Sequence, residues 1–348
     1  MKLYRIILPL ILTALIGCSS IKETTIAPKG GEKWKGIHLL GYSNDSDLVQ
    51  LGKIVPTLSS MGINVIVLEV DYNFQFQSHP ELRYGIKQIT RDGARTFANI
   101  CIENNIELIP EFQCLGHQSW AQETYPLLTK YPQFDLTPGA FPGNKDIYCR
   151  EWDLTNPELY KIVFSLLDEI IDAFQAKAFH AGMDEVFLLG SDKSPSTQGK
   201  DPGKLFAKAV NDIYDHLVKK RGIEMLMWAD RLIDGYKFNF GEWESSMNGT
   251  ASAIDMIPKD IILCPWHYEK MESYPSIPYL IDKGFRVLPS SWKDADAAKA
   301  LIDYSNEQRS PKMLGHLFTT WRKVDLLNYP PLVICIGMVG NQKKLSKK

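Results

Sequence analysis

The sequence predicts an α/β protein that folds as a single (β/α)8 barrel. Short apolar, β-branched runs recur along the chain, amphipathic helical patterns separate them, and eight such units occupy roughly 300 residues. Continuous apolar runs are typical of buried parallel strands, and strands that alternate with helices imply a parallel sheet. The predicted strands are Gly36–Tyr42, Ile63–Asp71, Ile106–Phe112, Ala176–Gly182, Ile223–Met227, Ile261–Cys264, Phe285–Pro289 and Met313–Thr319.

The helical patterns between these runs have recognisable ends. Apolar residues in Leu48–Leu58 repeat at intervals of three and four, and Gly62 follows them. The segment Thr155–Glu158 reads as a capping box ahead of Leu159–Phe174, and Leu205–Val218 is a further amphipathic run. A doubly wound open sheet is the alternative architecture. It is disfavoured because no glycine-rich phosphate-binding loop follows any of the predicted strands.

Composition narrows the class of protein. The chain has 348 residues, of which 45% are hydrophobic and 23% are charged, as expected for one large domain or two small ones. The formal net charge is −2 and long basic runs are absent from the sequence, so nucleic acid is not an expected partner. Five of the six cysteines are scattered without C-x-x-C spacing, which indicates neither a disulfide framework nor a zinc site.

The first residues have the pattern of a bacterial export signal. Lys2 and Arg5 precede the apolar run Ile6–Ile16, which is short for a membrane span, and Gly17-Cys18 follows. The end of the run resembles a lipobox, in which the cysteine is lipidated and becomes the first residue of the mature protein. We therefore expect attachment to a bacterial cell envelope through a lipid on Cys18. A plain secretion signal and an uncleaved anchor are the alternatives.

These patterns divide the chain into four parts. A flexible Ser-, Thr-, Lys- and Pro-containing tether separates the signal from the barrel, and lysines cluster at the end of the chain. The expected parts are a lipoprotein signal peptide (1–17), the tether (18–33), the barrel (34–340) and a basic tail (341–348).

Two adjacent acids carry the strongest functional signal. Asp184 and Glu185 follow the apolar run Ala176–Phe179. Because side chains alternate between the faces of a strand, neighbouring acids can serve one site only where the strand ends and the chain turns. Gly182 permits such a departure from the pleat. Acid pairs of this kind cleave glycosidic bonds.

Polar and aromatic residues follow the other predicted strands at their carboxyl ends. In (β/α)8 enzymes the active site lies at that end of the barrel. We therefore expect a set of substrate-binding residues around the two acids: Glu69, Asp71, His117, Trp228, Asp230, Trp266, Tyr268, Trp292 and Trp321.

Four of the eight tryptophans belong to this set. An indole offers a flat apolar face and one N–H donor. Such faces suit the C–H side of a pyranose ring, while acids and amides bind its hydroxyl groups. The shared placement of the tryptophans indicates a sugar pocket, although each of them alone is equally compatible with ordinary core packing.

The two acids are expected to have different roles. A neighbouring carboxylate and desolvation by the tryptophans would keep one acid protonated near neutral pH. Glu185 has the longer reach and is the expected donor to a glycosidic oxygen, while Asp184 stays ionised. His180, Asp184 and Glu185 are also metal-ligand types, but strand geometry would separate His180 from Asp184, so we expect neither a metal nor a cofactor.

With these residues the chain resembles glycoside hydrolase family 20, the β-N-acetylhexosaminidases, and most closely their compact hexosaminidase D branch. His180–Glu185 matches the family motif His-x-Gly-Gly-Asp-Glu with Met183 in place of the second glycine, and Ile109–His117 is similar to Ile-Pro-Glu-Ile-Asp-x-Pro-Gly-His. The similarity extends from about residue 36 over nearly the whole chain. Weaker matches are Met227–Asp230, Pro265–Tyr268 and Thr320-Trp321.

The resemblance implies an exo-acting enzyme that removes terminal GlcNAc or GalNAc by substrate-assisted, retaining hydrolysis, an exception to the scheme with two separate carboxylates. The acetamido oxygen of the sugar attacks the anomeric carbon. By resemblance, Glu185 is the general acid and then the general base, and Asp184 orients the acetamido group. Tyr268 is implied as a hydroxyl donor to the acetamido carbonyl.

Two departures from the family leave other functions open. Lys35 stands where we expect the family's sugar-binding arginine, and a lysine lacks the bidentate fork. Trp321-Arg322-Lys323 lacks the acid of the family's Trp-x-Glu. One alternative is therefore a non-catalytic surface lipoprotein that binds N-acetyl sugars on a degenerate barrel. The other is a retaining glycosidase of another family that uses Glu69 or Asp71.

Overall fold

The computed structural model describes residues 32–120, 123–140 and 147–341. The expected signal peptide, Cys18, nearly all of the tether and all but the first residue of the tail lie outside these ranges. Among the described residues, no helix combines the length and the apolar composition that crossing a membrane requires.

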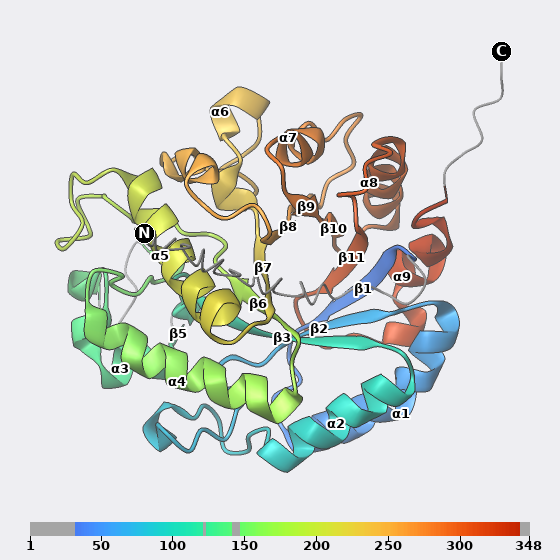
Figure 1. Cartoon of the computed structure of the whole chain (residues 1–348), viewed down its shortest axis with the longest axis horizontal. Coiled ribbons are helices and arrows are strands. Elements are labelled where there is room, and N and C mark those ends of the chain that lie inside the picture. Colours follow the sequence, from blue (N-terminus) through green and yellow to red (C-terminus); the bar gives the residue numbers. More distant parts are fainter. Residues whose placement is uncertain (1–31, 121–122, 141–146, 342–348) are drawn as a thin grey trace, which may run out of the picture.

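The chain forms an α/β fold around one curled sheet (Figure 1). The sheet has nine strands in the order β10-β11-β1-β2-β3-β6-β7-β8-β9, and every pairing in it is parallel. Its strands are β1 (Trp34–Leu39), β2 (Val65–Glu69), β3 (Glu107–Cys114), β6 (Ala178–Gly182), β7 (Glu224–Trp228), β8 (Ile262–Cys264), β9 (Arg286–Val287), β10 (Ser290–Ser291) and β11 (Gly315–Thr320). A separate antiparallel pair consists of β4 (Ser119–Trp120) and β5 (Glu123–Thr124).

The seventh predicted strand, Phe285–Pro289, contains β9, and a second short piece, β10, follows directly after it. β9 pairs with β8, and β10 pairs with β11, so the two edges of the sheet come from one short segment. Pro289 lies between the pieces and has no N–H to donate to a neighbouring strand. Single bridges from Val287 to Met313 and from Trp266 to Ser290 also link this segment to both sides. The sheet is therefore consistent with the expected barrel.

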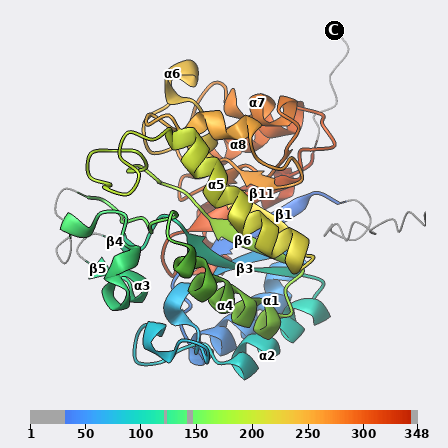
Figure 2. The ribbon, with the colours of Figure 1, turned by 60° about the vertical axis from the view of Figure 1, so that its left-hand side comes forward.

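Helices cover the outer face of the sheet. Figure 2 shows α4 and α5 in front of β3 and β6. α1 ends where Gly62 adopts a φ of 104°. The helices are α1 (Asp45–Met61), α2 (Arg91–Glu103), α3 (Pro126–Lys130), α4 (Pro157–Phe174), α5 (Pro202–Tyr214), α6 (Gly235–Phe238), α7 (Ser276–Asp282), α8 (Ala295–Glu307) and α9 (Pro330–Cys335).

The predicted capping box at the start of α4 is wrong by one residue. The side chain of Asn156, not that of Thr155, accepts a hydrogen bond from the N–H of Glu158, and Pro157 takes the first helical position. Thr155 instead donates its hydroxyl to Asp153. The helix itself is where the sequence predicts it.

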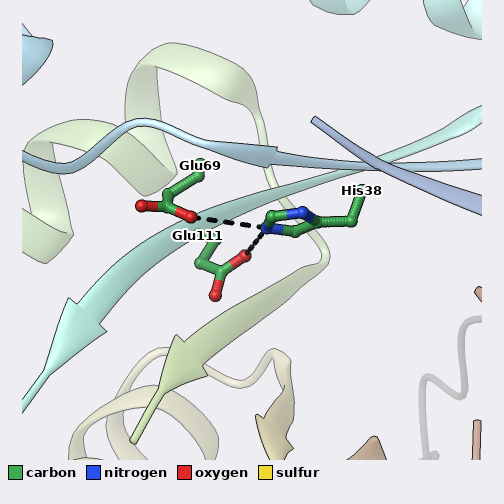
Figure 3. A group of neighbouring side chains, drawn as sticks. All are labelled: His38, Glu69 and Glu111. Atoms are coloured by element: carbon green, nitrogen blue, oxygen red, sulfur yellow. Dashed lines mark ion pairs between the residues drawn. The ribbon is translucent and has the colours of Figure 1, made fainter. Parts of the chain in front are cut away.

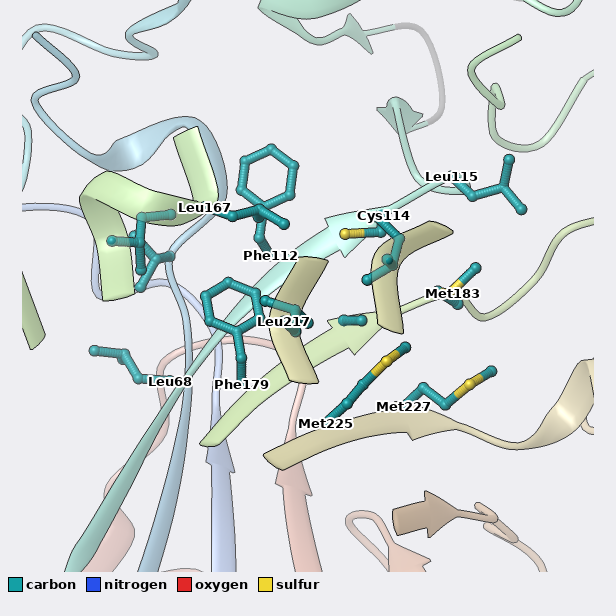
Figure 4. Packing of buried hydrophobic residues seen from close by; sticks show 14 of the residues in the cluster. Leu68, Phe112, Cys114, Leu115, Leu167, Phe179, Met183, Leu217, Met225 and Met227 are labelled. Atoms are coloured by element: carbon teal, nitrogen blue, oxygen red, sulfur yellow. The ribbon is translucent and has the colours of Figure 1, made fainter. Parts of the chain in front are cut away.

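Alternation along the strands divides the apolar core into two layers. Figure 4 shows Phe112 and Phe179 near Leu167 of α4, and Met225 belongs to the same layer. The residues of the opposite parity fill the inside of the curled sheet. This inner layer contains Trp34, Val65, Val67, Ile109, Ala178, Leu226, Trp228, Ile262, Cys264, Trp266, Leu288 and Leu317.

Candidate active site

A cavity of about 630 Å³ lies at the carboxyl ends of the strands. Active sites of (β/α)8 enzymes occupy this end, and a volume of this size is typical of a small-molecule site. The lining residues are Glu69, Asp71, Gln113, His117, Trp120, Tyr125, Tyr148, Asp184, Glu185, Gly241, Trp243, Glu244, Trp266, Tyr268, Glu269, Trp292 and Trp321.

The backbone leaves the regular pleat where the two acids begin. β6 ends at Gly182, which has a φ of 65°, and Met183 and Glu185 have φ values of 72° and 51°. A Cβ atom on Gly182 would lie 2.0 Å from Oε1 of Gln113, so only glycine fits there. The predicted turn at the end of this strand is confirmed, and it brings both carboxylates to the cavity.

The loop after β3 brings a histidine against both acids. His117 Nε2 lies 3.3 Å from Asp184 Oδ2 and 3.1 Å from Glu185 Oε2. The backbones approach so closely that a Cβ atom on Gly116 would lie 2.6 Å from the carbonyl oxygen of Asp184. We expected His117 to bind substrate, and the structure places it between the two catalytic candidates.

This arrangement changes the charge of the histidine. Burial alone would lower the pKa of His117, but the carboxylate of Asp184, together with Cys149 and Glu185, raises it well above its ordinary value. The imidazole therefore carries a positive charge at neutral pH. In this largely buried position it compensates negative charge on the adjacent acids.

Asp230 holds the backbone of Glu185 through a hydrogen bond. Asp230 Oδ2 accepts the N–H of Glu185 at 2.9 Å and the Nε–H of Arg231 at 2.6 Å. Burial raises the pKa of Asp230 to about 6, with Arg231 opposing the shift and Asp184 adding to it. Asp230 is buried and does not line the cavity, so it positions the acid instead of contacting a substrate.

A second buried acid fixes the chain after Glu185. One oxygen of Glu151 accepts the N–H groups of Phe187 and Leu188, at 2.6 and 2.7 Å. Burial raises the pKa of Glu151 to about 7, against the effect of these two hydrogen bonds. Glu185 is thus fixed on both sides by buried carboxylates.

An ion-pair cluster lies beneath the cavity, on the inner face of the sheet (Figure 3). His38 Nε2 lies 2.9 Å from Glu111 Oε2 and 3.4 Å from Glu69 Oε2. Glu111 Oε1 also contacts His180 Nδ1 at 2.9 Å and accepts the indole N–H of Trp228 at 3.0 Å. Glu111 of β3 therefore connects residues of three other strands, β1, β6 and β7.

The charges in this cluster are mutually dependent. Burial would lower the pKa of His38, but Glu111 and then Glu69 raise it to about 9. Burial would raise the pKa of Glu111, but His180 and His38 bring it below its ordinary value. The cluster therefore contains a buried imidazolium and a buried carboxylate at neutral pH.

The end of β2 contributes two more acids to the cavity wall. Asp71 has a φ of 44°, which turns it toward the side that Glu69 faces, and its Oδ1 accepts the N–H of Gln113 at 2.7 Å. Burial and the neighbouring Glu69 carboxylate raise the pKa of Asp71 well above its ordinary value. A protonated Asp71 can both donate to and accept from a hydroxyl group.

Aromatic rings form one side of the cavity. Trp266 stacks on Tyr268 with ring centroids 4.9 Å apart, and Trp292 lies 5.5 Å from Tyr268. Trp321 donates its indole N–H to Tyr268 Oη at 2.9 Å. Burial raises the pKa of Tyr268 well above its ordinary value, so its hydroxyl group keeps its proton. We refer to Trp266, Tyr268, Trp292 and Trp321 as the inner aromatic wall.

Besides Asp230, two further residues lie elsewhere than expected. Trp228 has no exposed surface and lies under the cavity, because it shares the inward parity of Leu226 on β7. Lys35 is the second residue of β1, at the end of the strand opposite to the cavity, and its N–H is bonded to Asn64. The assignment of Lys35 to the position of a sugar-binding arginine was therefore wrong.

Sequence reasoning missed several residues of the cavity wall. They are Trp120, which ends the two-residue strand β4, and Tyr148, Trp243, Glu244 and Glu269, which lie in loops that have no periodic pattern. The aromatic side chains among them are about 40 to 45% exposed. Exposed aromatic rings indicate a binding surface, but their exposure can be known only from the structure.

Two clusters contain side chains of metal-ligand type. The ligand atoms of His117, Asp184 and Glu185, and those of His38, Glu69 and Glu111, lie within 4.8 Å of one another. In both clusters the histidine has a raised pKa, so a metal ion would have to displace its proton in order to bind. As arranged, both clusters are ion pairs.

Sequence comparisons agree with this geometry. The chain is 24% identical over 230 residues to lacto-N-biosidase of Bifidobacterium bifidum, which covers 63% of this chain and 19% of that protein. It is 22% identical over 190 residues to hexosaminidase D of Bos taurus, which covers 53% of this chain and 51% of that protein. The chain therefore matches only part of the length of these curated relatives.

Comparisons with solved structures support the fold. The exo-β-N-acetylglucosaminidase of Vibrio harveyi superposes with a TM-score of 0.64 at 14% identity, over 91% of this chain and 55% of that one. Dispersin B superposes with a TM-score of 0.55 at 17% identity, over 88% of this chain and 98% of that one. The model of the glycosyl hydrolase family 20 catalytic domain matches residues 63–324, which include β2 to β11, both acids and the inner aromatic wall. The chain therefore belongs to glycosyl hydrolase family 20.

Proposed function

We propose that the protein is an exo-acting β-N-acetylhexosaminidase that removes terminal GlcNAc or GalNAc by substrate-assisted, retaining hydrolysis. The observation that carries this proposal is the placement of Asp184 and Glu185 on one cavity, with His117 between them. Family membership and the similarity to proteins named hexosaminidase support it. We also propose that the curled sheet is a closed (β/α)8 barrel in which β9 and β10 form one interrupted strand.

In the first step the acetamido oxygen of the substrate forms a bond to the anomeric carbon while the glycosidic bond breaks. Glu185 gives its proton to the departing oxygen. Asp184 Oδ1 is buried and has no hydrogen-bond partner among the described residues, so it is available to accept the acetamido N–H. Tyr268 Oη already accepts from Trp321 and keeps its own proton, which it can donate to the acetamido oxygen.

In the second step water attacks the anomeric carbon and the acetamido oxygen leaves it. Glu185, now a carboxylate, takes the proton of the water. No separate nucleophile is required, because the substrate supplies it. The inner aromatic wall and the acids of β2 would bind the ring faces and hydroxyl groups of the terminal sugar.

The experiment compares nitrophenyl β-glycosides of 2-acetamido sugars with their 2-hydroxy counterparts. We expect turnover of the acetamido substrates only. Glu185→Gln should reduce turnover by roughly 100-fold or more on substrates with poor leaving groups, and Asp184→Asn should also lose most activity. Glu307→Gln, at the exposed end of α8, is the matched control and should retain activity.

The alternatives predict different results. A retaining glycosidase that uses Glu69 or Asp71 would accept the 2-hydroxy substrates. A sugar-binding protein without activity would bind N-acetyl sugars and release no nitrophenol. The geometry disfavours the latter, because both acids and their supporting contacts are in place.

We further propose that Cys18 carries a lipid that attaches the protein to a bacterial cell envelope. The charged start, the short apolar core and the lipobox-like Leu15–Cys18 support this proposal. Metabolic labelling with a fatty acid should mark the wild-type protein and should not mark Cys18→Ser.

A further inference from the structure

Three exposed aromatic side chains gather at the mouth of the cavity. Trp120 is 40% exposed, Tyr148 is 41% exposed and Trp243 is 45% exposed, and all three line the cavity. The ring centroids of Tyr148 and Trp243 lie 4.8 Å apart, and those of Trp120 and Tyr148 lie 6.5 Å apart. We refer to these three residues as the outer aromatic group. Contiguous exposed rings at a cavity mouth are typical of a ligand contact.

The outer aromatic group lies on the side of the general acid. Trp120 and Tyr148 contact the ring of His117, with centroids 5.6 and 6.3 Å apart, and His117 in turn contacts both acids. Burial raises the pKa of Tyr148, and of the two acids Glu185 adds more to this rise than Asp184 does. The inner aromatic wall forms its own set of contacts. Among the described residues, no ring contact joins the two sets. Since the general acid protonates the leaving oxygen, the group beyond that oxygen must lie on the side of Glu185.

The backbone that carries Trp243 is held by a buried arginine. Arg231 is fully buried and its Nη2 donates to the carbonyl oxygens of Glu242, Trp243 and Ser245, at 2.6, 2.8 and 2.6 Å. Glu244 contacts the buried His267 at 2.5 Å. A ring that is fixed before binding costs less ordering free energy when a ligand stacks on it.

The buried pair Asp230 and Arg231 connects the general acid to the outer aromatic group. Asp230 accepts the N–H of Glu185 and the Nε–H of Arg231. The segment that carries Trp243 is thereby tied to the backbone of the general acid. This connection fixes the outer aromatic group relative to the bond that is cleaved.

We propose that Trp120, Tyr148 and Trp243 form a subsite for the leaving group, and that this group is a neutral sugar ring. The inference rests on the proposed function. Flat apolar faces match the C–H face of a pyranose, and the nearby carboxylates of Glu244 and Glu269 accept hydrogen bonds from hydroxyl groups. No lysine or arginine lines the described cavity, and the positive charge of His117 is paired with Asp184 and Glu185, so an anionic leaving group finds no unpaired cation there. The substrate is therefore an oligosaccharide with a terminal N-acetylhexosamine on a neutral sugar.

The test uses two substrates that share the terminal sugar. One is the N-acetylhexosaminyl fluoride, whose leaving group has no ring, and the other is a neutral disaccharide. Trp243→Ala and Tyr148→Ala should lower kcat/KM for the disaccharide at least ~10-fold more than for the fluoride, since one aromatic contact is worth about that factor. Trp292→Ala, in the inner aromatic wall, should lower both values to a similar extent. Tyr236→Ala is the matched control, because Tyr236 is 76% exposed and does not line the cavity.

The outcomes are distinguishable. If the wild-type protein hydrolyses both substrates and the outer variants lose equal activity on both, the leaving-group subsite is wrong while the proposed function stands. If the outer variants lose activity selectively on a glycosylated serine peptide and not on the disaccharide, the assignment of a sugar ring is overturned. If the wild-type protein hydrolyses neither substrate, the proposed function itself fails.

Discussion

His117 Nε2 lies 3.1 Å from Glu185 Oε2, although the two residues come from loops that follow different strands. Both residues have positive φ values, 52° and 51°. Both residues thus adopt unusual backbone conformations, which place the imidazolium of His117 next to the side chain of Glu185. The contact is therefore a built feature of the site, and removing it should affect catalysis more than folding.

We expect His117→Gln to reduce kcat/KM by roughly 100-fold, because small displacements of a reacting group have effects of that size. The variant should keep most of its resistance to chemical denaturation. Steady-state kinetics on an aryl N-acetylhexosaminide measures the loss, and His79→Gln, away from the cavity, is the control. Equal activity of the two variants would contradict a role for His117 in positioning the acids.

Arg231 is expected to be the most sensitive cation of the fold. In Arg231→Lys the hydrogen bonds to three backbone carbonyl groups are lost, and the buried Asp230 loses its guanidinium partner. The free energy of unfolding should therefore fall by about 3–5 kcal/mol. Arg221, whose side chain is 24% exposed, pairs with Asp168 and Asp172. Arg221→Lys should therefore change the free energy by only about 0–1 kcal/mol. Urea unfolding of both variants makes the comparison, and similar losses would show that the buried pair has no special weight.

Met183 stands at a position where the backbone favours glycine. Its φ is 72° and its side chain is buried. We expect Met183→Gly to have a free energy of unfolding about 1 kcal/mol higher than Met183→Ala, because alanine keeps the left-handed strain and glycine does not. At Met227, a buried residue within β7, we expect the opposite order: Met227→Ala should have a free energy of unfolding about 0.5–1 kcal/mol higher than Met227→Gly. Denaturation of the four variants tests both orders, and the same order at the two positions would refute the strain.

The buried cluster at His38 predicts a pH dependence of stability. Its pKa is raised to about 9 in the folded protein, whereas a histidine in an unfolded chain has a pKa of about 6.5. The folded state therefore binds this proton more tightly, and the stabilisation is complete below pH ~6.5 and is lost as the pH rises toward ~9. The free energy of unfolding should fall across this window.

Other groups titrate in the same range, so a variant is needed to isolate the effect. His38→Gln should lose the part of the slope that comes from His38, while His79→Gln should keep the slope of the wild-type protein. Urea unfolding at a series of pH values provides the measurement. A slope that is identical in wild type and His38→Gln would rule out the imidazolium beneath the cavity.

Much of the fold and part of the site could be predicted from the sequence. The strand positions follow from apolar runs, because both faces of a parallel sheet are buried. The convergence of Asp184 and Glu185 follows from one glycine at the end of one strand. Both patterns involve neighbouring residues of the chain, so they can be recognised in a single sequence.

The remaining contacts depend on distances that the sequence does not encode locally. The expected roles of Trp228 and Lys35 were wrong. Whether a side chain reaches the cavity depends on its position along the strand, and a single sequence does not give that position. The contact between His117 and the acids joins segments whose separation in space is set by the β3–β6 register and its irregularity after Glu111. Tyr148 and Trp243 lie in loops, and Trp120 lies in a strand of only two residues, so periodicity gives no information about any of them.

Five of the nine described non-glycine residues with positive φ lie in the turns that carry cavity-lining side chains: Asp71, Leu115, His117, Met183 and Glu185. Each such conformation is unfavourable on its own and persists only where the surrounding packing enforces it. Transplanting this chemistry to another scaffold would therefore require copying the loop paths together with their buried supports. A designer who grafted only the side chains onto regular strands would obtain the same functional groups aimed in other directions.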